Sequence, residues 1–178
     1  YHNTINLDNA ATSTSSACLY IYSCCTSLNA QNAIVNNNIF AVTNAASASV
    51  CFYFVNGYYY SIANTSSAFD YNVFWKAGAG ASTAIAWDWG TQPTPSNIVG
   101  LQGQSTGIAY NSNSKYQNMQ FYSNTDLRIN YTTLAFPRQA MVLADYNGTS
   151  RPANTDPGAY ETPTPNNEVA ITGITAPA

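Results

Sequence analysis

The sequence predicts an all-β protein: a right-handed parallel β-helix (solenoid) of about three to four coils, with an irregular C-terminal cap and a strand-like tail. Two kinds of segment recur along the chain at a sequence offset of 33 or 34, and both are rich in aromatic and β-branched side chains. No heptad or helical hydrophobic period accompanies them. Repeated strands that cannot bury their own faces are typical of a solenoid, in which each repeat stacks on the next.

The first repeated segment is an aromatic strand. Residues 18–24, 51–57 and 84–90 align at an offset of 33 and are bounded by Ser, Thr, Asn and Gly. Successive side chains of a strand point to opposite faces, and an inward Asp88 would bury an unpaired charge. We therefore expect two interior stacks: Leu19 with Phe52 and Ile85, and Ile21 with Phe54 and Trp87. The outward positions are then Cys18, Cys51, Ala84, Tyr20, Tyr53 and Ala86.

The second repeated segment is rich in asparagine. Residues 36–40 align with residues 70–74 at an offset of 34, and residues 2–6 fall in the same frame. The alignment predicts an aliphatic stack of Ile5, Ile39 and Val73. It also places Asn38 above Asn72 at the strand spacing of about 4.8 Å, where their amides can form a ladder.

The repeat fades after about residue 90. Beyond a Pro-rich breaker at residues 91–95, the chain is loop-like, and Asp126–Ile129 is predicted to be a short strand. We assign residues 1–161 to the β-helix with its cap, residues 162–167 to a linker and residues 168–178 to a tail strand. The tail carries Val169, Ile171 and Ile174 and has no strand of its own to pair with, so we predict that it links subunits.

Two motifs close the repeat region. They are Asp145-Tyr-Asn-Gly-Thr-Ser-Arg151-Pro152 and Asp156-Pro-Gly-Ala-Tyr-Glu161. These motifs resemble the D-x-x-G-x-x-R-P and D-x-G-A-Y-E endings of bacterial surface right-handed parallel β-helix proteins, in the pectate-lyase-like superfamily. The resemblance covers residues 1–161. It implies a β-helix fold, but the family holds both polysaccharide lyases and adhesive or structural proteins, so it leaves function open. Residues 169–174 resemble the first strand of an immunoglobulin-like module, which is the alternative interpretation of the tail.

The composition of the chain argues against two classes of function, nucleic-acid binding and membrane insertion. Charged residues make up 7% of the chain, against about 25% in ordinary proteins, and only five are Lys or Arg. Such a chain cannot build the basic patch that nucleic acid requires. No run approaches the roughly 18 apolar residues of a membrane span, so no membrane insertion is expected. The chain starts without Met or a leader pattern, which indicates processing or an excerpt of a longer protein.

Cysteine usage points to an oxidising compartment. The four cysteines are Cys18, Cys24, Cys25 and Cys51. An even number in a chain poor in Lys favours an extracellular or cell-surface (secreted) protein with up to two disulfides, whose pairing the sequence leaves open. The repeat places Cys18 and Cys51 one above the other. Buried free thiols are the alternative.

The chain offers little catalytic chemistry. His2 is the only histidine, and no cofactor or metal set is evident. Polysaccharide cleavage would have to use Asp70, Asp88 and Lys76, which we expect to be solvated loop residues instead. Exposed aromatics offer contacts to carbohydrate or to a partner: Tyr58, Tyr59, Tyr60, Trp75 and Trp89. Arg151 is expected to pair with Asp145, Asp156 or Glu161, holding a loop-rich cap over the last coil.

We therefore predict a non-catalytic extracellular structural or adhesive protein. An open first coil, a spare tail strand and low charge all favour head-to-tail self-association into a filament, or contact with neighbouring domains of a longer chain. A polysaccharide-binding or polysaccharide-lyase domain is the alternative.

Overall fold

A computed structural model describes residues 1–8, 16–22, 34–43, 49–55, 69–77, 86–87, 111–130 and 134–162. In this part of the chain all regular secondary structure is β. No helix there is long and apolar enough to span a membrane. The prediction of an all-β protein is confirmed for these residues.

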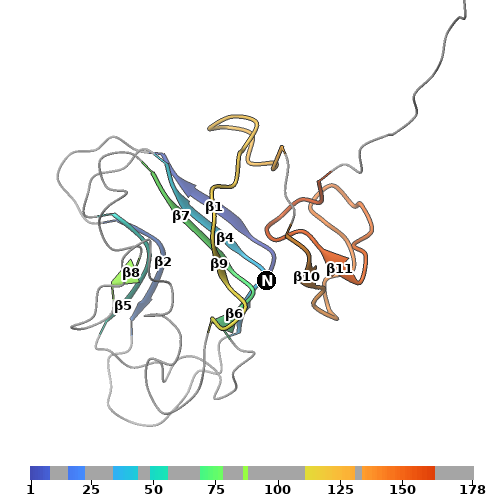
Figure 1. The fold of residues 1–178 in the computed structure, drawn as a ribbon, viewed down its shortest axis with the longest axis horizontal. Helices are drawn as coiled ribbons and strands as arrows, with labels where there is room; N and C mark the ends of the chain where they lie inside the picture. The colour runs from blue at the N-terminus through green and yellow to red at the C-terminus, as the bar shows by residue number, and fades with distance from the viewer. Residues whose placement is uncertain are drawn as a thin grey trace, which may run out of the picture.

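The described strands form three parallel sheets and one antiparallel pair (Figure 1). The largest sheet has the order β1 (Thr4–Leu7), β4 (Ile39–Val42), β7 (Val73–Lys76) and β9 (Lys115–Tyr116). The second has the order β2 (Ala17–Tyr22), β5 (Val50–Val55) and β8 (Ala86–Trp87). The third pairs β3 (Val35–Asn36) with β6 (Phe69–Asp70). The antiparallel pair is β10 (Phe136–Pro137) with β11 (Asn154–Thr155).

Each parallel sheet adds its strands in chain order. Thr4 pairs with Ile39, Ile39 pairs with Val73, and in the second sheet Ala17 pairs with Val50. The spacing of these partners matches the predicted period to within one position, so the period is the real pairing register. The spacing is longer at β9, where Lys115 pairs with Val73.

Each of the three predicted stacks is shifted by one residue at one member, and Trp87 lies opposite Tyr53 instead of Phe54. Leu19 opposite Phe52 and Ile21 opposite Phe54 are confirmed. However, Ala86 lies opposite Phe52 in place of Ile85, and Ile5 lies opposite Phe40 instead of Ile39. The connections from β1 to β4 and from β5 to β8 are one residue longer than the alignment implies. Because side chains alternate along a strand, a shift of one residue moves a side chain to the other face of the sheet. Thr4, not Ile5, therefore continues the Ile39–Val73 column.

An aromatic core fills the space between the two larger sheets. Phe52 is fully buried and its ring lies 5.4 Å from that of Phe69 and 5.6 Å from that of Phe74. Phe74 in turn stacks on Phe40 with 5.8 Å between centroids. Tyr20 is 59% exposed and stacks on Tyr53, which confirms the outward position predicted for Tyr20.

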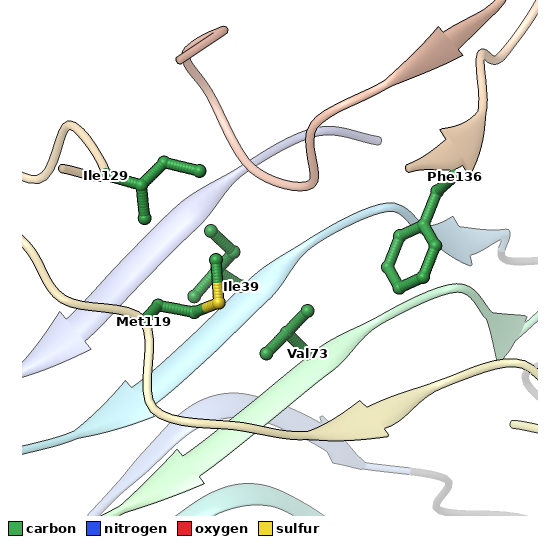
Figure 2. Packing of buried hydrophobic residues seen from close by; sticks show 5 residues of the cluster. All are labelled: Ile39, Val73, Met119, Ile129 and Phe136. Carbon is green, nitrogen blue, oxygen red and sulfur yellow. The ribbon is translucent and has the colours of Figure 1, made fainter. Parts of the chain in front are cut away.

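The opposite face of the large sheet is covered by the C-terminal part of the chain. Because strand residues alternate, Ile39 and Val73 face away from the aromatic core, where they pack with Met119, Ile129 and Phe136 (Figure 2). The segment expected to cap the last coil lies along this outer face instead, because an apolar column there must be shielded from water. The strand predicted at Asp126–Ile129 is reduced to a single antiparallel bridge between Ile129 and Phe121.

The C-terminal part also reaches the first strand. The Gly158 N–H donates to the Asn37 carbonyl at 2.7 Å, and the Ala159 N–H donates to Thr4 Oγ1 at 2.9 Å. Gly158 has φ +84°, and any side chain there would collide with Thr4 and Ile39. Only glycine fits this contact.

Candidate functional site

A ladder of polar side chains runs across the large sheet, one step before each strand. Asn38 Oδ1 accepts from the backbone N–H and the amide of Asn3, at 2.9 and 3.0 Å. Asn72 Oδ1 accepts the same two groups of Asn38, both at 3.0 Å. The Asn72 N–H then donates to Ser114 Oγ at 2.9 Å. The predicted Asn38–Asn72 ladder is confirmed, and Asn3 extends it.

The ladder also has a fixed backbone turn. The residues before Asn3, Asn38 and Asn72 all have positive φ: 53° at His2, 59° at Asn37 and 55° at Tyr71. A left-handed residue is uncommon outside glycine, so its recurrence at one position marks a shared, repeated bend. This bend turns each asparagine toward the next one.

The ladder is directional, with different ends. Each asparagine oxygen accepts from the unit that precedes it in the chain, and the Ser114 hydroxyl closes the last step by donating to Asn111 Oδ1 at 2.8 Å. At the first step, no donor within the described part of the chain reaches Asn3 Oδ1. Asn3 is also exposed, whereas Asn38 and Asn72 are buried. The ladder therefore ends on an open acceptor at β1.

We expect Asn72→Leu to lower the free energy of unfolding by about 2–3 kcal/mol. The substitution leaves the buried donors of Asn38 without an acceptor, and it leaves the Val35 carbonyl, to which the Asn72 amide donates at 2.7 Å, without a donor. Asn3→Ala is the matched control, with an expected loss of about 0.5–1 kcal/mol since water reaches that end. Urea denaturation followed by fluorescence measures both. Equal losses would contradict a ladder buried at one end and open at the other.

The open acceptor lies on an edge shared by the parallel sheets. β1, β2 and β3 each stand at the end of their sheet, with a paired strand on one side only in the described structure. Between them is a pocket of about 140 Å³ lined by Asn3, Ile5, Leu19, Ile34, Val35 and Phe40, together with Tyr1 and Asn38. Ile34 is 45% exposed, and Ile5 and Leu19 are half-buried. This open edge therefore combines unpaired strands with accessible apolar side chains.

The structure places the two described cysteines opposite each other. Cys18 lies between the register pairs Ala17–Val50 and Leu19–Phe52, hence beside Cys51, as predicted. Both are free thiols. The outward positions predicted for both are wrong, because their thiols point to the neighbouring sheet. Cys18 donates to the Ala41 carbonyl at 3.1 Å, and Cys51, which is fully buried, donates to the Trp75 carbonyl at 3.3 Å. Burial raises the pKa of Cys18 to about 12, which keeps this thiol protonated at neutral pH.

Several predicted site residues lie outside the described residues. They are Cys24, Cys25, Tyr58, Tyr59, Tyr60, Trp89, Val169, Ile171 and Ile174, together with most of the linker and the whole tail. Trp75 is described and is half-buried. Its ring lies 5.3 Å from that of Tyr116, so one of its faces is occupied by protein.

The polar residues considered for polysaccharide cleavage are not solvated. Asp70 is buried, and its carboxylate accepts from the Tyr71 N–H at 2.8 Å and from the Asn113 N–H and amide, each at 2.7 Å. Lys76 is also fully buried. The expectation of solvated loop residues is wrong for both, and the Asp70 carboxylate holds the backbone and side chain of neighbouring residues. Asp88 lies outside the described residues.

The closing motifs meet around one buried arginine. Arg151 is 1% exposed and forms an ion pair with Glu161. It also donates to the carbonyls of Gly158 at 2.8 Å and Asp156 at 3.2 Å. Of the three carboxylates considered as partners, the structure selects Glu161.

The other two carboxylates bind backbone. Asp145 accepts the N–H groups of Asn147, Thr149 and Glu161 at 2.9, 2.7 and 3.0 Å. Burial alone would raise the pKa of Asp145, but these donors and the charge of Arg151 outweigh it, so the pKa lies below its usual value. Asp156 accepts the Thr162 N–H at 2.6 Å.

His2 lies at the junction between β1 and the closing motifs. Its side chain is 5% exposed, and neither ring nitrogen has a hydrogen-bond partner among the described residues. Burial, the charge of Arg151 and the N-terminal ammonium lower its pKa to about 4. Nothing in the sequence pattern indicates a buried histidine so near the start of the chain.

We predict that stability falls by about 2–3 kcal/mol as the pH drops from about 6.5 to 4. The folded state holds His2 neutral, so its stability is complete above the unfolded pKa, and protonating the unfolded chain costs stability below it. His2→Asn, which tolerates the left-handed backbone, should remove this slope. The chain has one histidine, so the difference between parent and variant in urea denaturation across this range isolates its effect from that of the carboxylates. An unchanged slope in the variant would contradict it.

A second pocket lies among the closing motifs. Its volume is about 540 Å³, and its lining includes Tyr122, Arg128, Asp145, Asn147, Asn154 and Asp156. Tyr122 is 53% exposed, and the Arg128 guanidinium lies 5.3 Å from its ring centre. Neither residue is singled out by the sequence, because both lie in a stretch without repeat signal.

Comparison of the chain with protein-family models, curated proteins and solved structures found no match. The resemblance to bacterial surface β-helix proteins therefore stays a prediction.

Proposed function

We propose that this protein is a non-catalytic extracellular structural or adhesive protein whose parallel sheets are the faces of a right-handed parallel β-helix. In this proposal the open edge of β1, β2 and β3 joins the molecule to another copy, head to tail, or to a neighbouring domain of a longer chain. The low charge of the sequence supports the proposal, because little electrostatic repulsion opposes contact between edges.

The observation that carries the proposal is the open edge itself. Three edge strands, an open ladder acceptor at Asn3 and a pocket lined by apolar side chains occur together on one side of the molecule. Proteins ordinarily protect such edges with charge, proline or a covering loop. In the described part of this edge the pocket lining contains no charged side chain. An edge that no described residue covers is suited to strand addition.

The test is self-association of the intact protein. We expect concentration-dependent oligomers by sedimentation velocity and fibres by negative-stain electron microscopy. Ile34→Lys places a charge in the edge pocket and should weaken association at least tenfold. Met141→Lys is the control, since Met141 is 79% exposed and lies away from that pocket. A protein that stays monomeric at high concentration would overturn the proposal.

Polysaccharide binding has one observation in its favour, the pocket of about 540 Å³ near Tyr122 and Arg128. An exposed aromatic ring beside polar and charged groups is suited to stacking on a sugar and bonding its hydroxyls. Titration with neutral and uronic-acid oligosaccharides tests this second function, with Tyr122→Ala as the variant. Binding lost in Tyr122→Ala would support it, and no binding by the parent would reject it.

A further inference from the structure

The large sheet repeats one hydrogen-bond pattern at every step. The N–H that follows each of Asn38, Asn72 and Ser114 donates to the carbonyl of the ladder asparagine in the preceding strand: Ile39 to Asn3, Val73 to Asn38 and Lys115 to Asn72, all at 2.8 Å. In a parallel ladder, alternate residues of one strand face its two neighbours. The next donor in this series is therefore the Thr4 N–H, at the free side of β1.

An added strand must satisfy four requirements that these contacts define. It needs an asparagine to donate its N–H and amide to Asn3 Oδ1 and to offer its carbonyl to Thr4. It needs a residue that tolerates positive φ before that asparagine, as at His2 and Asn37. Two and four residues after the asparagine it needs apolar side chains, because those positions continue the inward columns of Ile5–Phe40 and Leu7–Val42.

One segment of the chain outside the described residues meets all four. Residues 166–171 read Asn-Asn-Glu-Val-Ala-Ile, beside Asn-Asn-Ile-Phe-Ala-Val at residues 37–42. Asn167 takes the ladder position, and Asn166 is a residue type that favours the left-handed bend. Val169 and Ile171 fall on the two inward columns, and Ala170 falls opposite Asn6, in the column of Ala41. Ile174 lies beyond the strand.

We propose that residues 166–171 of a second copy add to β1 as the next parallel strand, with Asn167 on Asn3, Val169 on Ile5 and Ile171 on Leu7. This inference rests on the proposed self-association and specifies its linking strand and register. The segment before it, Thr162-Pro-Thr-Pro165, favours extended backbone because each residue that precedes a proline is biased away from the helical region. A spacer that favours extended backbone is suited to carrying the strand to a neighbouring molecule.

The first experiment compares two single variants of the full chain by sedimentation velocity. Ile171→Asp puts a charge on an inward column and should weaken self-association at least tenfold. Ile174→Asp makes the same chemical change three residues later, outside the proposed strand, and should leave association within twofold of the parent. If the parent assembles and neither variant weakens it, this inference is overturned while self-association stands. A parent that does not assemble overturns both proposals.

The second experiment fixes the register and the source of the strand. The pair Ile5→Cys with Val169→Cys places two thiols in neighbouring strands at the same level, within disulfide reach. We expect oxidation to produce covalent oligomers on a non-reducing gel, with the linked peptides identified by mass spectrometry. Ile5→Cys with Ile174→Cys is the mismatched control and should link poorly. A link formed within one monomer would overturn the exchange between copies.

Discussion

Phe52→Ala should lower the free energy of unfolding by about 3–5 kcal/mol. Phe52 is fully buried where the two larger sheets face each other, and its ring contacts both Phe69 and Phe74. Removing the ring leaves a cavity between rigid strands that cannot close around it, so the cost includes lost burial and lost packing. Chemical denaturation measures the change.

Met141→Ala is the control for this variant. Met141 is 79% exposed, and a substitution at such a site should change stability by no more than about 0.5 kcal/mol. If Phe52→Ala unfolds at the same denaturant concentration as the parent, the two sheets do not share one aromatic core.

Arg151→Met should cost about 3–5 kcal/mol, because it leaves the Glu161 carboxylate without its cation. It also removes the donors that hold the carbonyls of Asp156 and Gly158. The closing motifs should then detach from β1, and limited proteolysis should cut first between residues 134 and 162. Thermal unfolding gives the size of the loss.

The double variant Arg151→Met with Glu161→Gln separates charge from shape. Neutralising Glu161 removes the buried unpaired charge, so the double variant should recover part of the loss caused by Arg151→Met alone. A double variant that is as unstable as the sum of the two single variants would show that the ion pair contributes nothing beyond its neighbouring hydrogen bonds.

The strand period and the ladder could be predicted from sequence because both repeat. The spacing of Leu19 and Phe52, and that of Asn38 and Asn72, reflects stacking that the structure shows. The predicted register differs from the observed one by one residue at Ala86 and at Ile5. The difference arises from the length of the connecting loops, which the strand sequences do not reveal. One residue is enough to exchange the two faces of a strand.

The C-terminal packing could not be predicted in the same way. Met119, Ile129 and Phe136 have no periodic spacing, and their common feature is the apolar column of Ile39 and Val73 that they cover. His2 is buried because it lies against the closing motifs, which are far from it in the chain. Arg151 differs, since its partners lie within ten residues of it and Glu161 is one of the carboxylates with which the closing motifs predicted it to pair. Contacts between residues far apart in the chain form only on the assembled sheets, so the sequence near each residue does not predict them.

The contact between Ala159 and Thr4 has a consequence for the order of folding. These residues are separated by 155 positions, and Gly158 binds Asn37 beside them. The outer face of β1 therefore cannot be completed until residues 158 and 159 have emerged from the ribosome. Closing a loop of this length is entropically costly, and proteins dominated by distant contacts fold slowly. Until residues 158 and 159 are synthesised, the β1 end of the outer column stays accessible, and chaperones that recognise exposed strands have their longest opportunity to bind there.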